Sequence, residues 1–333
     1  MLQSLLTNHE HREKPVKAQK SGGKRYDIQR EIQQLVSIQE KSAQEAGELC
    51  FTSRLLIQAT IPHSEPKSNE WVRTNGNLTL TMLAPSSVGL PFGWYARLIL
   101  IWITTQASRN KSRLDRGYIS EEEARTLDLG PSLRRFMLSL GLKVSGGENG
   151  SINPFREQMN RLFKTTISVT YIECSEDTEY MVERDTGGRV SNESCIWWSM
   201  KNKPEHDLSF NSWVELSPKF FDMVTKKPVP LDMRLIRFIK RSPMGLDIYF
   251  WATHRVSYLK RETCIHWPDL KAQFGTGYPD TTRGLQDFKS NFREGLTKVK
   301  TIWPGLDATP TKKGLLLKPC APQVSRKQLS LRG

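Results

Sequence analysis

The clearest amphipathic pattern in the chain lies near its C-terminal end, over residues 281–303. Apolar residues recur there at steps of three and four, which is the spacing of one face of an α-helix: Leu285, Phe288, Phe292, Leu296 and Val299. The opposite face carries side chains that hydrogen bond to base edges and phosphates: Arg283, Gln286, Lys289, Ser290, Arg293 and Thr297. The pattern predicts a helix whose apolar side packs against its own domain and whose polar side binds DNA.

The segments on either side of this helix support that interpretation. Upstream, "PDLKAQFG" reads as a short helix ended by Gly275. Downstream, Pro304 and Gly305 stop the long helix, and "LDATPTKKGLLLKP" predicts a hairpin with Lys312 and Lys313 at its turn. A short helix, a long helix and a lysine-tipped hairpin are the order of a winged helix-turn-helix, in which the lysines follow the DNA backbone.

The residues before this unit complete a C-terminal domain. We expect a strand in "NSWVELS", a short helix in "PKFFDMVTKK", a basic helix in "VPLDMRLIRFIKR", a long buried helix in "SPMGLDIYFWATHRVSYLK" and an extended link in "ETCIHW".

The first half of the chain has a similar order of elements. Strands are expected in "ELCFTSRLLIQATIPHS" and "NGNLTLTMLAP", followed by a buried helix at 92–107. "SEEEARTLDL" starts a helix with a Ser N-cap, and "PSLRRFMLSLG" and "INPFREQMNRLFKTT" predict two more. Two strand-like runs, "ISVTYIEC" and "ESCIWWSMK", follow, with a turn-rich "RDTGGRVSN" between them. The sequence therefore predicts an α+β fold with two tandem winged helix-turn-helix domains.

The expected domain boundaries follow from these patterns. Residues 1–49 form a flexible N-terminal segment with a helix at 27–49, which either contacts a second copy or docks on its own domain. Residues 50–203 form the N-terminal winged-helix domain, 204–318 the C-terminal one, and 319–333 a basic tail.

The N-terminal domain contains two candidate DNA-contacting helices. The later one, at 152–166, precedes the hairpin and is the recognition-type helix; its polar set is Arg156, Asn160, Arg161 and Lys164. The shorter helix before it carries Arg134 and Arg135. This domain fits either full recognition of DNA or a dimerisation role with partial DNA contact. The sequence does not decide which of the two helices contacts the DNA.

Charge separates the two halves. The 333 residues are 37% hydrophobic and 25% charged, which is typical of a globular protein, and the formal net charge is +14. Such a balance indicates a polyanionic partner, most often nucleic acid, although an anionic membrane surface produces the same bias. Residues 43–200 hold 17 basic and 18 acidic side chains, whereas residues 205–318 hold 19 and 12. The C-terminal domain is therefore the main polyanion-binding unit expected.

Signatures of enzymes, metals and membranes are missing from the sequence. It has neither G-x-x-x-x-G-K-[ST] nor G-x-G-x-x-G, and its one close His pair, His9 and His11, lies in the polar N-terminus. Five scattered cysteines without C-x-x-C spacing favour reduced thiols in the cytoplasm and no zinc site. We see no signal peptide, and the apolar run 94–105 is too short to span a bilayer. The expectation is a cytoplasmic protein without catalytic residues, cofactor, metal or membrane partner.

Parts of the sequence resemble a known family. "PVPLDMRLIRFIKRSPMGLDIYFWATHRVSYL" (228–259), "IHWPDLKAQFG" (265–275), "DFKSNFREGLTKVKTIWPG" (287–305) and "GLLLKPCAPQV" (314–324) are similar to RepA-type replication initiators of theta-replicating bacterial plasmids. The resemblance covers about residues 85–325 and is strongest over 212–322.

The resemblance implies a protein that binds repeated sequences (iterons) in double-stranded DNA at the plasmid origin. It also implies opening of adjacent AT-rich DNA, recruitment of the host replication initiator and helicase, and a monomer–dimer balance in which a homodimer limits copy number. A sequence-specific transcriptional repressor is the alternative function. A nickase or primase would need a metal-dependent site, for which the sequence offers no candidate.

Overall fold

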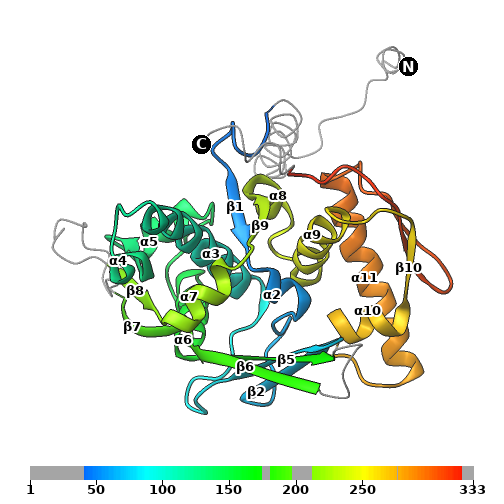
Figure 1. The fold of residues 1–333 in the computed structure, drawn as a ribbon, viewed down its shortest axis with the longest axis horizontal. Helices are drawn as coiled ribbons and strands as arrows, with labels where there is room; N and C mark the ends of the chain where they lie inside the picture. Colours follow the sequence, from blue (N-terminus) through cyan, green and yellow to red (C-terminus); the bar gives the residue numbers. More distant parts are fainter. Residues whose placement is uncertain (1–40, 175–180, 197–211, 276, 325–333) are drawn as a thin grey trace, which may run out of the picture. The chain divides into compact units, whose positions relative to one another are not determined.

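Two buried helices, α3 (Gly93–Asp115) and α9 (Pro243–Val256), form the centre of the fold. The computed structural model describes residues 41–174, 181–196, 212–275 and 277–324, and from Lys41 onward the chain is one compact unit (Figure 1). Every residue from 96 to 105 and from 244 to 253 is buried. A helix that is apolar on all sides belongs in a core. The buried helices predicted at these places are confirmed, and α3 continues beyond the predicted residue 107.

The N-terminal half contributes a four-stranded antiparallel sheet in the order β2-β3-β5-β6. The elements of this half, besides α3, are β1 (Leu49–Thr52), α2 (Arg54–Gln58), β2 (Glu70–Asn75), β3 (Leu78–Leu83), α4 (Glu121–Arg125), β4 (Thr126–Gly130), α5 (Leu133–Ser139), α6 (Ile152–Lys164), β5 (Thr166–Cys174), β6 (Met181–Arg189) and β7 (Ser191–Cys195). The predicted cap of α4 is confirmed, because Ser120 and Glu123 form a reciprocal capping box.

The C-terminal half ends in a small antiparallel sheet in the order β10-β12-β11. Its elements, besides α9, are β8 (Ser212–Leu216), α7 (Pro218–Thr225), β9 (Val229–Asp232), α8 (Met233–Ile239), β10 (Thr263–His266), α10 (Trp267–Phe274), α11 (Thr282–Ile302), β11 (Ala308–Pro310) and β12 (Gly314–Leu317). The long amphipathic helix, the short helix before it and the hairpin after it are where the sequence predicts them. The fold is thus mixed α/β.

Three pairs of strands connect the halves. β8 follows the expected domain boundary at 204, yet it lies between β4 and β7 in one sheet, and β1 pairs antiparallel with β9. Segments from both sides of residue 204 therefore share hydrogen-bonded sheets. The division into domains at that residue remains a prediction.

Three local predictions are wrong. Residues 54–58, expected as strand, form α2, because "RLLIQ" consists mainly of good helix formers. The segment 184–192, expected as a turn, lies mostly in β6, where Gly187 fits because a Cβ there would lie 2.7 Å from Ile167 O of β5. The basic helix expected over 229–241 begins only at α8, since the Asp232 side chain accepts from Arg234 N and caps the helix. The helix predicted at 27–49 is also wrong where it can be compared, because residues 41–49 form turns and the start of β1; the rest of it lies outside the described residues.

A buried ion pair ties α3 to α9. Arg97 Nε donates to Asp247 Oδ1 at 2.7 Å and Nη2 donates to Oδ2 at 2.6 Å, with side chains 3% and 5% exposed. The same guanidinium donates to the carbonyls of Ile61 and Pro62, at 2.8 and 3.0 Å. His63 Nε2 donates to Asp247 Oδ2 at 2.7 Å. One carboxylate therefore holds two helices and the segment after α2 in register.

Helix α9 in turn carries α11. The two helices cross closely at Gly295, where a Cβ would lie 3.0 Å from Ile248 Cδ1, 3.1 Å from Met244 Cγ and 3.3 Å from Gly245 N. A side chain at this position would require Ile248 and Met244 to move, so glycine favours the close approach of the two helices. The position of α11 therefore depends on α9, and the position of α9 on its bond to α3.

Replacing Asp247 by Asn should destabilise the protein strongly. The change leaves the Arg97 guanidinium buried without a counter-charge, and breaking a buried pair in this way costs about 3–5 kcal/mol. Asp115→Asn is the matched control, because Asp115 pairs with Lys111 on the surface at the end of the same helix α3, where an ion pair contributes about 0–1 kcal/mol. Denaturant unfolding measures both; equal losses would contradict the assignment.

The half-buried His63 should make the fold sensitive to mild acid. Burial lowers the pKa of His63 from 6.5, and the charge of Arg97 lowers it further. The hydrogen bond to Asp247 raises the pKa, but it only partly offsets these two effects. Just below pH 6.5 the unfolded chain therefore binds more protons than the folded one, so the free energy of unfolding falls as the pH drops through this window. His63→Gln keeps an N–H donor but does not titrate, and should flatten this dependence in unfolding curves recorded between pH 7.5 and 5.5. An unchanged slope would show that His63 does not cause it.

Candidate nucleic-acid interface

Helix α11 begins at a capped, well-defined residue. The Thr281 side chain accepts a hydrogen bond from Gly284 N at 3.0 Å, which is the standard N-cap arrangement. Its buried face packs Phe288 and Phe292 against Trp267 and Phe274, with ring centroids 5.6–6.5 Å apart. This aromatic cluster fixes how far the helix stands out from its domain and how it is rotated.

The opposite face of α11 points to solvent, as the sequence predicts. Arg283 is 90% exposed at its side chain. The other exposed members of the predicted set are Gln286, Ser290, Arg293 and Thr297, and Lys289 is half-buried. These six side chains, which we call the α11 polar face, lie together along one side of the helix. Whether they bind DNA stays a prediction.

Trp267 organises this surface from the side. The guanidinium of Arg293 lies 5.1 Å from its ring centroid and the Lys289 ammonium lies 5.7 Å away, both within range of a cation–π interaction. Trp267 Nε1 donates to Thr311 O at 3.1 Å, and its backbone N–H donates to Lys313 O at 3.2 Å. One residue therefore positions two cations of the polar face and the hairpin tip together.

The hairpin tip is basic and exposed. Thr311 N donates to Gly314 O at 2.7 Å, which closes the turn and leaves Lys312 and Lys313 exposed between them. Gly314 is required here because a Cβ would lie 2.0 Å from Ile265 O of β10. The tip thus holds two ammonium groups on a rigid turn beside Trp267.

Few carboxylates compensate these charges. Arg283 Nε lies 4.0 Å from Asp287 Oδ2, but both side chains are well exposed, so the pair is weak. Glu294 is already paired with Lys298 at 2.7 Å. Within the described part of the chain, no ion pair engages Lys289, Arg293, Lys312 or Lys313. The surface is therefore positive and suits an anionic partner.

The candidates on α6 divide into two groups. Asn160 and Lys164 are exposed and Arg156 is half-buried, all on one side of the helix. Arg161 is different, because its side chain is only 10% exposed and its Nη2 donates to both Glu65 and Glu157 at 2.6 Å. Two carboxylates neutralise this guanidinium, so we correct its assignment from a DNA contact to a structural ion pair.

The candidates on α5 lie at the surface. Arg134 and Arg135 are both exposed near the beginning of the helix, whose N-cap Ser132 accepts from Arg135 N at 3.3 Å. The structure leaves both residues accessible, so either α5 or α6 can offer the N-terminal contact.

The described ranges contain no group of three or more His, Cys, Asp or Glu side chains that could hold a metal ion. None of the helices described is both long and apolar enough to cross a membrane.

Trp267 is the residue that sequence reasoning missed. The sequence pattern gives it no role, because its contacts with α11 and the hairpin join segments that lie far apart along the chain. The available signal was its position directly before Pro268 at the start of a helix, where a large aromatic residue is fixed by the chain on both sides.

The chain is similar to known proteins in its sequence and in its structure. A family model described as plasmid encoded RepA protein matches residues 90–268, more than half of the chain. A crystal structure of domains 2 and 3 of RctB, as a selenomethionine derivative, is 12% identical with a TM-score of 0.49; the match covers 81% of this chain and 96% of that one. A second RctB structure is 11% identical with a TM-score of 0.43, covering 79% and 96%. No curated protein matches the sequence.

The contact between Trp267 and Arg293 should appear as a coupling energy. We expect a double-mutant cycle with Trp267→Phe and Arg293→Ala to give about 0.5–1 kcal/mol in the free energy of unfolding, because Trp is the stronger cation–π partner. The same cycle with Arg283→Ala is the control and should be additive, since no contact joins Arg283 to Trp267. Additivity in both cycles would contradict the positioning role.

Proposed function

Because the chain belongs to the family of plasmid-encoded RepA proteins, we propose that it initiates plasmid replication by binding repeated sequences in duplex DNA at the origin. The observation that carries this proposal is the α11 polar face: six hydrogen-bonding side chains aligned on the solvent side of a rigid helix, next to a lysine-tipped hairpin. An α-helix of this kind fits the major groove, where each base pair has a distinct donor and acceptor pattern.

The order of elements supports a winged helix-turn-helix in the C-terminal half. Helix α9 is followed by β10, α10, α11 and the β11–β12 hairpin, and β10 pairs with β12 to form the small sheet. In that arrangement the second helix of the pair enters the major groove and the hairpin follows the backbone. We therefore propose α11 as the recognition helix and the β11–β12 hairpin as the wing.

Each side chain of the polar face then has a proposed role. Arg283, near the N-terminal end of α11, pairs bidentately with guanine, and Gln286 pairs with adenine. Ser290, Arg293, Lys289 and Thr297 contact phosphates or base edges further along the groove. Lys312 and Lys313 contact the adjacent backbone, where they contribute to affinity and not to sequence preference.

The N-terminal half repeats the order of elements. Helix α3 is followed by β4, α5, α6 and the β5–β6 hairpin, with the additional short helix α4 between α3 and β4. Its sheets differ, since β4 pairs with β8 and the hairpin extends a sheet with β2 and β3. We propose a second winged helix here that forms a homodimer contact and adds DNA contacts through Arg134, Arg135, Arg156, Asn160 or Lys164.

The rest of the proposal concerns what binding achieves. We infer that the protein opens DNA beside the repeats and recruits the host replication initiator and helicase, without catalysing a reaction itself. A plasmid that carries the repeats should replicate when the protein is supplied in trans. Binding of the repeats without replication would identify a transcriptional repressor instead, and Mg²⁺-dependent, site-specific cleavage would identify a nicking enzyme.

Two substitutions should separate base recognition from backbone binding. Arg283→Ala should cost about 1–3 kcal/mol of binding to the repeat and relax the preference at one base position, because it removes one bidentate contact. Lys312→Ala should weaken binding to all sequences and reduce the slope of log K against log salt by about one unit, because it removes one phosphate contact.

Titrations of repeat and random duplexes at several salt concentrations measure both effects. Lys219→Ala is the matched control, because Lys219 is exposed on α7, outside the proposed interface. Equal losses on repeat and random DNA for Arg283→Ala and Lys312→Ala would contradict the assigned roles.

A further inference from the structure

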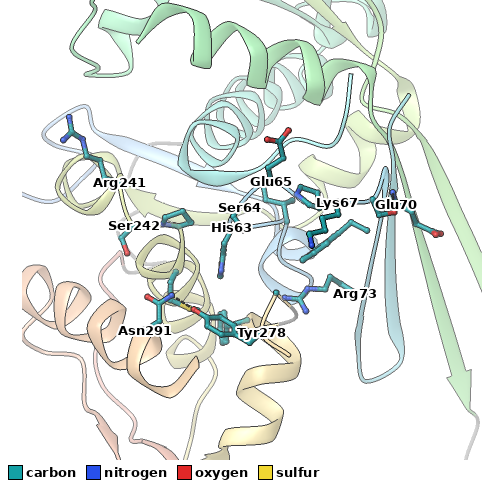
Figure 2. Close-up of a pocket in the computed structure, with 18 of the residues that line it drawn as sticks. His63, Ser64, Glu65, Lys67, Glu70, Arg73, Arg241, Ser242, Tyr278 and Asn291 are labelled. Atoms are coloured by element: carbon teal, nitrogen blue, oxygen red, sulfur yellow. Dashed lines mark hydrogen bonds between the residues drawn. The ribbon is translucent and has the colours of Figure 1, made fainter. Parts of the chain in front are cut away.

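A pocket of about 900 Å³ lies beside the proposed DNA-binding face without including it. Its walls come from the segment 61–73, the first turn of α9 and the flank of α11 (Figure 2). From α11 it takes Asn291 and Lys298, and none of the six residues of the polar face. Small-molecule sites typically enclose roughly 300–1,000 Å³, so the space suits a ligand larger than a single ion.

A buried cation forms part of the wall. Arg73 is 3% exposed, and Figure 2 shows it pointing from β2 towards Tyr278 across the pocket. Its Nη atoms donate to Thr60 Oγ1 and to the carbonyls of Ala272 and Gln273, at 3.1–3.2 Å, so these partners are all neutral. Its Nε has no hydrogen-bond partner in the described part of the chain.

The charge of Arg73 is therefore only partly compensated. The two carbonyls belong to the last turn of α10, so Arg73 also stabilises that helix end. Burial nevertheless lowers its pKa to about 10, although the charge of Asp247 opposes the shift. At neutral pH the guanidinium remains protonated beside the pocket, where an anion would stabilise it.

The first turn of α9 adds a second and independent attraction for an anion. Arg241, Ser242, Pro243 and Met244 all border the pocket, and α9 begins at Pro243 with Ser242 as its N-cap. Pro243 has no N–H, Gly245 N donates to Ser242 Oγ, and Leu246 N donates to Ser242 O. The first turn therefore offers the Met244 N–H and the positive partial charge of the N-terminus of a 14-residue helix. The helix end and Arg73 lie on the same pocket.

The remaining charges of the lining point the same way. Glu65 is paired with Arg161, and Lys298 is paired with Glu294, so these two lining residues are compensated elsewhere. In Figure 2 Lys67 extends towards Arg73, whereas the carboxylates of Glu65 and Glu70 point away from it. The interior of the pocket is positive.

Aromatic side chains supply flat apolar walls. Trp71 and Tyr278 line the pocket and are half-buried; Trp71 Nε1 donates to Thr60 O at 3.0 Å, and the Asn291 amide donates to the Tyr278 hydroxyl. Phe274 also borders the pocket, but it is 1% exposed. The Arg73 guanidinium lies 5.1 Å from the centroid of the Trp71 ring, so a planar heterocycle can stack on the other face of Trp71 or on Tyr278. Positive charge together with aromatic walls selects for a ligand that carries both an anionic group and a ring.

We propose that this pocket binds a nucleoside phosphate, with its phosphate beside Arg73 and Lys67 and its base against the aromatic walls. The inference does not rest on the proposed function, because it concerns a ligand bound in the absence of DNA. It involves binding alone and no reaction.

Isothermal titration calorimetry on the full chain, without DNA, tests the proposal with AMP, adenosine and inorganic phosphate as probes. AMP should bind at least ten-fold more tightly than either adenosine or phosphate, since only AMP satisfies both halves of the site. Lys67→Ala should weaken AMP binding at least five-fold. Lys226→Ala, an exposed lysine at the end of α7 outside the pocket, should leave it unchanged.

Three results would overturn the inference. AMP and inorganic phosphate binding equally would leave no role for the aromatic walls. Equal effects of Lys67→Ala and Lys226→Ala would indicate attraction by overall charge. Displacement of AMP by a random duplex, with Lys67→Ala weakening both ligands alike, would make the pocket a site for backbone phosphate. If the Arg73→Met variant folds, it should also bind AMP more weakly than the wild-type protein. If it does not fold, the Lys67→Ala titration alone tests the proposal.

Discussion

The bond between Arg97 and Asp247 is the interaction on which the arrangement of this protein depends. It joins two helices that are 150 positions apart in sequence, and both side chains are almost completely buried. Removing two charges from water costs nearly as much as their attraction returns, so such a pair contributes little net stability compared with apolar packing. What it contributes is geometry, because only one relative placement of α3 and α9 lets the guanidinium reach the carboxylate and the two carbonyls of the segment after α2. We interpret the pair as the constraint that selects this placement.

The proposed DNA-binding face depends on that constraint through one further contact. Helix α11 lies directly against α9 at Gly295, where Gly245 N and the side chains of Ile248 and Met244 come close to it. Aromatic rings from α10 also pack against α11, so rotation about its axis is fixed as well. A recognition helix must present its polar residues at a defined angle, since a small rotation moves each side chain to a different base edge. The packing of the core thus fixes the orientation of the side chains that are proposed to contact the bases.

The sequence predicts the parts of this structure that local pattern controls. The α11 boundaries, its solvent-facing side and the lysine-tipped hairpin all follow from periodicity and from the preferences of Pro and Gly. Contacts between distant segments could not be predicted in the same way. The strand β8 lies between β4 and β7, Arg161 is neutralised by Glu65, and Trp267 lies beside Arg293 only because the chain has folded. Gly187 was misread for the same reason, since the glycine that suggests a turn serves here to admit a neighbouring strand.

The central claim is that α11 reads base edges in the major groove, and guanine substitution tests it most directly. Replacing each guanine of a bound repeat in turn by 7-deazaguanine removes only its N7 acceptor, which lies in the major groove. If Arg283 contacts guanine N7, the wild-type protein should lose affinity at one guanine, whereas the Arg283→Ala variant should lose none there. Uniform insensitivity of the wild-type protein at every guanine would contradict it.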